Sequence, residues 1–201
     1  MNWKRSLLLS ILVVLGCAGV IEAQRRWERL PPPRDPQFYE ARNKLEDFDG
    51  RMETVLIKGR SWVGTARAQN GSARVEAIEI RDSSSNAQAT GVVITINADG
   101  GPAGEIRSLI DYDEIDALIK AMDTAAKASE AITKLTHFEV HYRTKGDFEV
   151  MVFKQQSNNA IASAIEGGFF DRARLYFTLD DFTKLRWMIV QARDKLDEVK
   201  S

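Results

Sequence analysis

The chain has 201 residues, and its 28 lysine and arginine residues nearly balance its 29 aspartate and glutamate residues. Such a balance gives no general attraction to nucleic acid or to anionic lipid. The length suffices for one substantial hydrophobic core, and Cys17, the single cysteine, excludes an internal disulfide. The fold must therefore be held together by its core.

The first 23 residues predict a secretory signal peptide. Lys4 and Arg5 precede an apolar stretch from Leu7 to Ile21, and small residues continue to Ala23. The apolar stretch has 15 residues, whereas a membrane-spanning helix needs about 20. We therefore expect the segment to be removed during export to the periplasm or the outside of the cell.

Three positions are candidates for this cleavage. Cuts after Ala18 or Ala23 both follow a small residue, and we favour Ala23 because a polar segment begins at the next position. A cut after Gly16 is the third, because Val14-Leu15-Gly16-Cys17 resembles the lipobox of bacterial lipoproteins. That resemblance implies lipidation of Cys17 and, as an alternative localisation, a protein anchored to the membrane by lipid.

A spacer and a folded region follow the signal. Residues 24–36 are rich in arginine and proline, and four of the last six are proline, which favours an extended backbone. Residues 37–201 are expected to form a single α+β domain. At its start, Phe38, Ala41, Leu45 and Phe48 recur at helical spacing, and Gly50 is placed to end that helix.

The first half of this domain, residues 51–130, predicts strands followed by a helix. Strand-like segments lie at 54–57 and 61–63 on either side of Gly59, and then at 75–80, 91–96 and 105–110. Asn70-Gly71 predicts a hairpin with a type I′ turn. The helix has Asp111 as its expected N-cap, Glu114 as the matching capping residue, and an apolar stripe formed by Ile115, Leu118, Ile119, Met122 and Ala126.

The second half, residues 131–201, repeats this order. Strands are predicted at 138–142, 148–153, 160–165 and 174–178, and a helix at 180–199. The apolar face of that helix consists of Phe182, Leu185, Ile189, Ala192, Leu196 and Val199. At an offset of 67 residues, Thr178 and Asp181 stand where the first half has Asp111 and Glu114. The sequence thus predicts an antiparallel sheet from two related halves, each of about four strands followed by one amphipathic helix.

The sequences around these two helix starts resemble two protein families. Leu179-Asp180-Asp181-Phe182-Thr183-Lys184-Leu185 resembles the repeats of the Pur and Whirly families. That likeness implies paired sheets that each carry a helix, and the binding of single-stranded nucleic acid. Residues 110–122 also resemble an uncharacterised family of exported bacterial proteins, a resemblance that implies no activity.

The two histidines are the candidates for metal binding or catalysis. On a strand, His137, Glu139, His141 and Arg143 share one face. Neighbours on that face are about 6.6 Å apart and the outer pair about 13 Å, so one strand cannot present all three potential zinc ligands to one ion. We favour a solvated polar face, with a metal site or a hydrolase using His137 or His141 as its base as alternatives.

Other motifs have structural explanations. The carboxylates Asp111, Asp113, Glu114 and Asp116 lie at a predicted helix start, where negative charge meets the positive end of the helix dipole. Residues 59–65 have the glycine spacing of a phosphate-binding loop but lack its lysine and do not lead into a helix. We therefore assign neither a catalytic nor a cofactor-binding role to these segments.

A platform for single-stranded nucleic acid needs aromatic side chains beside basic ones on an open sheet. Trp62 with Arg60, Arg67 and Arg74 meets this description in the first half; Tyr142 with Arg143 and Lys145 meets it in the second. Trp62 and Tyr142 suit a core equally well, and an exported protein seldom meets single-stranded nucleic acid.

The sequence as a whole favours a non-catalytic exported binding or scaffolding protein that needs no cofactor. We expect its partner to be a protein or an envelope component rather than nucleic acid, and a membrane only if Cys17 is lipidated. A hydrolase and a single-stranded nucleic-acid-binding module are the alternatives.

Overall fold

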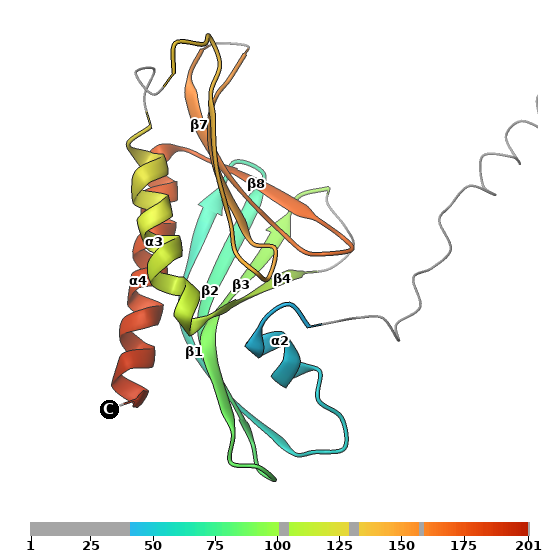
Figure 1. The fold of residues 1–201 in the computed structure, drawn as a ribbon. Helices are drawn as coiled ribbons and strands as arrows, with labels where there is room; N and C mark the ends of the chain where they lie inside the picture. Colours follow the sequence, from blue (N-terminus) through green and yellow to red (C-terminus); the bar gives the residue numbers. More distant parts are fainter. Residues whose placement is uncertain (1–40, 101–104, 129–132, 157–158, 201) are drawn as a thin grey trace, which may run out of the picture. The chain divides into compact units, whose positions relative to one another are not determined.

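The computed structural model describes residues 41–100, 105–128, 133–156 and 159–200. The predicted signal peptide, the spacer, Cys17 and the start of the predicted helix at Phe38 lie outside these ranges. The first half contains α2 (Lys44–Asp49), β1 (Leu56–Ala68), β2 (Gly71–Asp82), β3 (Gln88–Ala98), β4 (Ile106–Asp111) and α3 (Tyr112–Ala126). The second contains β5 (Glu139–Arg143), β6 (Glu149–Lys154), β7 (Ile161–Gly167), β8 (Ala173–Phe177) and α4 (Leu179–Lys200) (Figure 1).

The strands form two antiparallel four-stranded sheets, in the orders β1-β2-β3-β4 and β5-β6-β7-β8. Each sheet leads directly into a helix, so the predicted α+β class with two related halves is confirmed. The correspondence keeps the offset seen in the sequence: β4 and β8 begin at 106 and 173, and α3 and α4 begin at 112 and 179.

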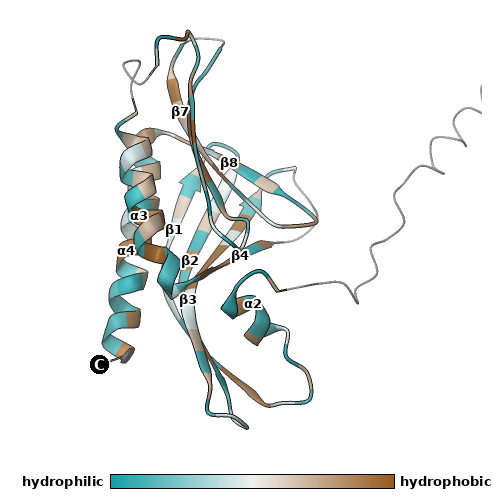
Figure 2. Ribbon diagram, in the orientation of Figure 1, coloured by the Kyte–Doolittle hydropathy of each residue, from teal (hydrophilic) through white to brown (hydrophobic). Residues whose placement is uncertain are grey.

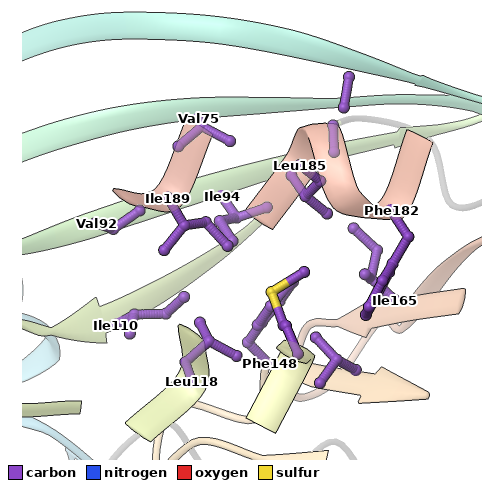
Figure 3. Packing of buried hydrophobic residues seen from close by; sticks show 14 of the residues in the cluster. Val75, Val92, Ile94, Ile110, Leu118, Phe148, Ile165, Phe182, Leu185 and Ile189 are labelled. Carbon is purple, nitrogen blue, oxygen red and sulfur yellow. The ribbon is translucent and has the colours of Figure 1, made fainter. Parts of the chain in front are cut away.

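Both sheets share one hydrophobic core with α3 and α4. We call the face of each sheet that meets this core its inner face. In Figure 3, Val75, Val92 and Ile94 of the first sheet lie across from Leu185 and Ile189 of α4, with Ile165 of the second sheet and Phe148, just before β6, close by. All of these side chains are fully or almost fully buried. Burial of each such side chain contributes about 1.5–3 kcal/mol, so packing against α3 and α4 adds to the stability of both sheets.

A smaller core lies on the opposite, outer face of the first sheet, beneath α2. Leu45 and Phe48 of this helix pack against Ile78, Ile80 and Val93. The close approach depends on a glycine in β3, since a Cβ at Gly91 would lie 2.6 Å from a methyl group of Leu45. The helix ends at Gly50, as predicted, but it begins only at Lys44, after the N-cap Asn43, so the predicted inclusion of Ala41 is wrong.

Gly59 does not divide the first strand. Instead of two short strands, β1 runs unbroken from Leu56 to Ala68, with a bulge between Trp62 and Gly64. A glycine weakens a strand without ending it when the ladder to the neighbouring strand continues on both sides. That ladder continues here, because Gly59 pairs with Glu79 of β2.

The hairpin predicted at Asn70-Gly71 is present, but its turn is not type I′. The two turn residues are Gln69 and Asn70, and Gly71 already belongs to β2, where it pairs with Ala68. Neither Gln69 nor Asn70 has the positive φ that type I′ requires. Asn70 is held by tertiary contacts instead, since its amide group donates to the carbonyl of Arg174 and accepts from the amide of Tyr176.

The two helix starts differ in their caps. Asp111 precedes α3 as predicted, but its carboxylate makes no hydrogen bond to that helix. It accepts instead from the amides of Lys44 and Leu45, at 2.8 and 2.9 Å, and so caps α2. Thr178 behaves as predicted, because its hydroxyl accepts from the amide of Asp181 at 3.1 Å. Asp111 thus occupies the predicted N-cap position of α3, but the predicted hydrogen bond is absent because its carboxylate accepts from the first amides of α2, which the Asn43 side chain does not reach.

The predicted apolar faces of the helices are largely buried. In α4 the buried face runs from Phe182 to Leu196, while Val199, in the last turn, is 58% exposed and lies beyond it. In α3 the predicted stripe is buried except at Ala126, where the neighbouring Ala125 takes the inward position. None of the described helices is both long enough and apolar enough to cross a membrane.

Candidate functional site

The outer face of the first sheet carries the aromatic and basic side chains predicted for a binding surface. Residues paired across antiparallel strands share a face. Thr65, Arg74, Thr95 and Arg107 form one such row across all four strands. Trp62 lies opposite Glu76 in the adjacent row, on the same face. We call the surface formed by Arg60, Trp62, Arg67, Arg74 and Arg107 the Trp62 face.

Trp62 is 64% exposed, so it belongs to the surface rather than the core. Within the described ranges, Arg60, Arg67 and Arg107 are exposed and have no hydrogen-bond or ion-pair partner. Arg74 differs, because it pairs with Glu105 at 2.9 Å and with Glu76 at 3.5 Å. The face therefore combines an exposed indole with three uncompensated guanidinium groups.

Local sequence explains why these side chains point outward. Val75, Ala73 and Ala66 face the core, so their neighbours along the strands point away from it. The bulge between Trp62 and Gly64 shifts the alternation by one residue, which keeps Thr65 and Arg67 on the outer face with Trp62. Figure 2 shows the resulting mixture of hydrophilic and hydrophobic segments along β1 to β4.

The second predicted platform is not assembled. Tyr142 packs partly buried against the main core, on the inner face of the second sheet, whereas Arg143 lies on the outer face. Arg143 is also paired with Glu149 at 2.6 Å. The ammonium group of Lys145 lies 3.8 Å from Asp113, and its backbone amide donates to Glu114. These three side chains thus have separate, structural roles.

A row of charged side chains crosses the outer face of the second sheet. Arg143, Glu149, Glu166 and Arg174 are directly paired across its four strands. Glu166 bonds to Arg174 and to Arg172, both at 2.5 Å, and Arg172 also approaches Glu149 at 3.4 Å. Both glutamates are less than a tenth exposed, and their charges are compensated by the arginines around them.

His141 joins this network at one end. Its Nδ1 lies 2.7 Å from Glu149 Oε1, and its Nε2 lies 3.0 Å from Glu139 Oε2. The hydrogen bond to Glu149, and then that to Glu139, raises the pKa of His141 above its usual value. Burial opposes ionisation of Glu149, but hydrogen bonds from His141 and Arg143 outweigh it and lower the pKa of that carboxyl group.

This arrangement leaves His141 poorly placed to act as a base. Both of its ring nitrogens already have carboxylate partners, so a nucleophile would have to displace one of them. His137 is exposed. Across the described parts of the chain, no group of three or more His, Cys, Asp or Glu side chains is placed to hold a metal ion. Glu139 and His141 are two residues apart on β5 and contact each other, but His137 is not part of this contact.

The acidic residues at the start of α3 also have separate partners. Asp111 caps α2, and Glu114 accepts from the amide of Lys145 at 2.8 Å. Asp113 lies 3.5 Å from the ammonium group of Lys44, and Asp116 lies 2.9 Å from Arg193 of α4. The cluster therefore ties α3 to three other parts of the fold.

Sequence reasoning did not find all members of these surfaces. Arg107 was missed because its position opposite Thr95 depends on the pairing of β3 and β4. Glu149 and Glu166 were missed because each sits alone in an apolar strand segment. A charged residue in such a segment is itself an indication of a buried ion pair.

Comparisons with protein-family models, with curated proteins and with solved structures gave no match.

Proposed function

We propose that this chain is a non-catalytic exported protein that binds a partner through the Trp62 face. The observation that carries the proposal is an indole that is 64% exposed, on a face where Arg60, Arg67 and Arg107 have no partner among the described residues. Exposed tryptophan and arginine are enriched among the side chains that dominate binding energy at interfaces. The guanidinium groups favour a partner that presents carboxylate or phosphate groups.

Within the described residues, the side chains proposed for catalysis are engaged in other contacts, which supports binding over hydrolysis. His141 uses both ring nitrogens in its contacts with Glu139 and Glu149, and the carboxylates near α3 are engaged in caps and ion pairs. The hydrolase alternative therefore has no observation in its favour. A metal site at His137, Glu139 and His141 was the alternative to a solvated polar face. Among the described residues these three side chains do not form a group placed to hold a metal ion.

Single-stranded nucleic acid is the second candidate partner. The placement of Trp62, Arg60, Arg67 and Arg74 on one face suits base stacking with phosphate contacts. We favour an acidic protein partner, because the predicted signal peptide would carry the protein away from nucleic acid.

A binding experiment with matched tryptophan variants tests the proposal. The purified protein is titrated with fluorescein-labelled polyglutamate and, separately, with oligothymidylate, and fluorescence anisotropy is recorded. Trp62→Ala should weaken binding of whichever probe binds the unsubstituted protein by about tenfold or more. Trp187→Ala is the control, because Trp187 is 57% exposed but lies on α4. Equal effects of the two substitutions, or no binding of either probe, would overturn the proposal.

Intact-mass spectrometry of the protein recovered from its native host tests export and anchoring. A mass beginning at Gln24 or Gly19 supports an exported protein free of lipid. A mass beginning at lipidated Cys17 supports export with a membrane anchor. A mass that retains Met1 would overturn export. Zinc analysis of the same sample shows whether His137 and His141 should be the residues to mutate.

A further inference from the structure

We propose that the free edge of β1 binds an extended acidic peptide segment of a partner protein as an added antiparallel strand. The proposal rests on the binding function assigned to the Trp62 face and names the partner class and the binding mode. In this mode, main-chain hydrogen bonds supply affinity, and pockets for alternate side chains supply specificity.

β1 has the geometry that strand addition requires. It is the first strand of its sheet and pairs with β2 alone, so its other edge faces no strand of the described chain. It is 13 residues long, and the four residues 57–60 are all exposed. A Cβ at Gly59 would meet no atom within 4 Å. The segment from Ile57 to Arg60, before the bulge, thus offers an exposed strand edge.

The charge of this edge selects the partner. β1 carries Lys58, Arg60 and Arg67 and has no acidic residue. A second copy of β1 would add three more positive charges to the same surface, and lysine or arginine on an edge strand opposes such self-pairing. An acidic strand gains favourable cross-strand pairs instead. Charge complementarity therefore favours a different, acidic chain over a homodimer.

The alternation of side chains sets the pattern expected in that strand. Lys58, Arg60 and Trp62 point to the outer face, whereas Ile57, which is 58% exposed, points to the inner face. Lys58 already bonds to Asp49 at 2.5 Å, whereas Arg60 has no partner among the residues that the structure describes. We expect an acidic residue opposite Arg60, an aromatic or aliphatic residue opposite Trp62, and an apolar residue on the alternate face opposite Ile57.

Backbone-methylated peptides separate strand addition from simple charge attraction. The parent probe is a short fluorescein-labelled peptide in which glutamate alternates with valine, with one phenylalanine. Two analogues carry backbone N-methyl groups on alternate residues. The first is methylated at the odd-numbered residues, and the second at the even-numbered residues. In an added strand, only one set of amides faces β1. One analogue should therefore bind about tenfold or more weakly than the parent, and the other should bind like the parent.

Protein variants and hydrogen exchange provide the matched controls. Arg60→Glu should abolish binding of the parent peptide, while Lys120→Glu, an equal charge change at an exposed position of α3, should leave it unchanged. Bound peptide should slow amide exchange within residues 56–62. A lysine-valine peptide of the same length should not bind.

The outcomes distinguish this inference from the function on which it rests. If the parent peptide binds and loses affinity in Trp62→Ala, but both methylated analogues bind equally well, the Trp62 face binds acidic chains and strand addition is wrong. If oligothymidylate binds and the peptide does not, the partner is nucleic acid and the acidic-peptide proposal is overturned. If no probe binds, both proposals fail.

Discussion

Gly71, next to the first hairpin turn, and Gly59, near the start of β1, show how one residue type serves different purposes. Gly71 has a φ of +140°, and a Cβ on it would lie 2.0 Å from the carbonyl oxygen of Asn97 and 2.9 Å from a methyl group of Leu175. Leu175 belongs to β8, so Gly71 lets the second sheet approach the hairpin of the first. Gly59, by contrast, lies in open space.

We expect Gly71→Ala to destabilise the fold by about 2 kcal/mol or more, because the added methyl group strains the backbone and separates two packed elements. Gly59→Ala should change the free energy of unfolding by less than about 0.5 kcal/mol. Urea denaturation of both variants measures the difference. Similar stabilities for the two would show that the contact at Gly71 relaxes without cost.

His141 gives the molecule a predictable pH dependence. Because Glu149 and then Glu139 raise its folded-state pKa, its ion pairs stabilise the fold fully below the ordinary histidine pKa of about 6.5. That contribution is lost as pH rises through the raised pKa. His141→Gln should therefore destabilise the protein more near pH 6 than near pH 8.5.

NMR titration of the imidazole should find the pKa of His141 above its ordinary value, and Glu139→Gln should lower it. Glu139 is the suitable partner to change, because it is exposed and contacts His141 at the surface. A titration unchanged by this substitution would mean that the two side chains do not interact in solution.

Among the elements, α2 and α4 begin with different kinds of cap. Thr178 caps α4 through a local hydroxyl, in a capping pair with Asp181. α2 uses its own Asn43 at its N-cap, and in addition the carboxylate of Asp111 from β4. The caps by Thr178 and Asn43 are local in sequence. The cap by Asp111 joins residues more than sixty positions apart.

Thr178→Ala should lower the free energy of unfolding by about 1 kcal/mol, the usual value for loss of an N-cap hydroxyl. Thr178→Ser is the control, since it keeps the hydroxyl and should restore most of the stability. Thermal or chemical denaturation of the pair decides the point. If serine and alanine are equally destabilising, the hydroxyl does not cap α4.

For the whole molecule, the shared core predicts that the two halves unfold together. Phe182 of α4 is fully buried in a cluster that includes residues of both sheets. Phe182→Ala should cost about 3–5 kcal/mol. Circular dichroism and tryptophan fluorescence should still report one coincident transition. Trp187→Ala, at an exposed position of the same helix, should cost under about 1 kcal/mol. Two separate transitions would show that the halves are independently stable.

The sequence by itself determined the order of strands and helices and the repeated strand-to-helix unit, because alternation, helical spacing and turn residues are local properties. It also indicated which side of the strand at His141 faces outward. The continuity of β1 through Gly59 required the pairing with β2, which local sequence does not contain.

Tertiary structure decided the rest, because these features join residues far apart in the chain. Asp111 caps a different helix from the one it precedes, Tyr142 turns to the core while Trp62 stays exposed, and Arg107 reaches the Trp62 face through two intervening strands. The compensation of Glu149 and Glu166 by arginines likewise follows from strand register. Cross-strand pairing brings such side chains together, and its register is set by the packing of whole faces rather than by nearby residues.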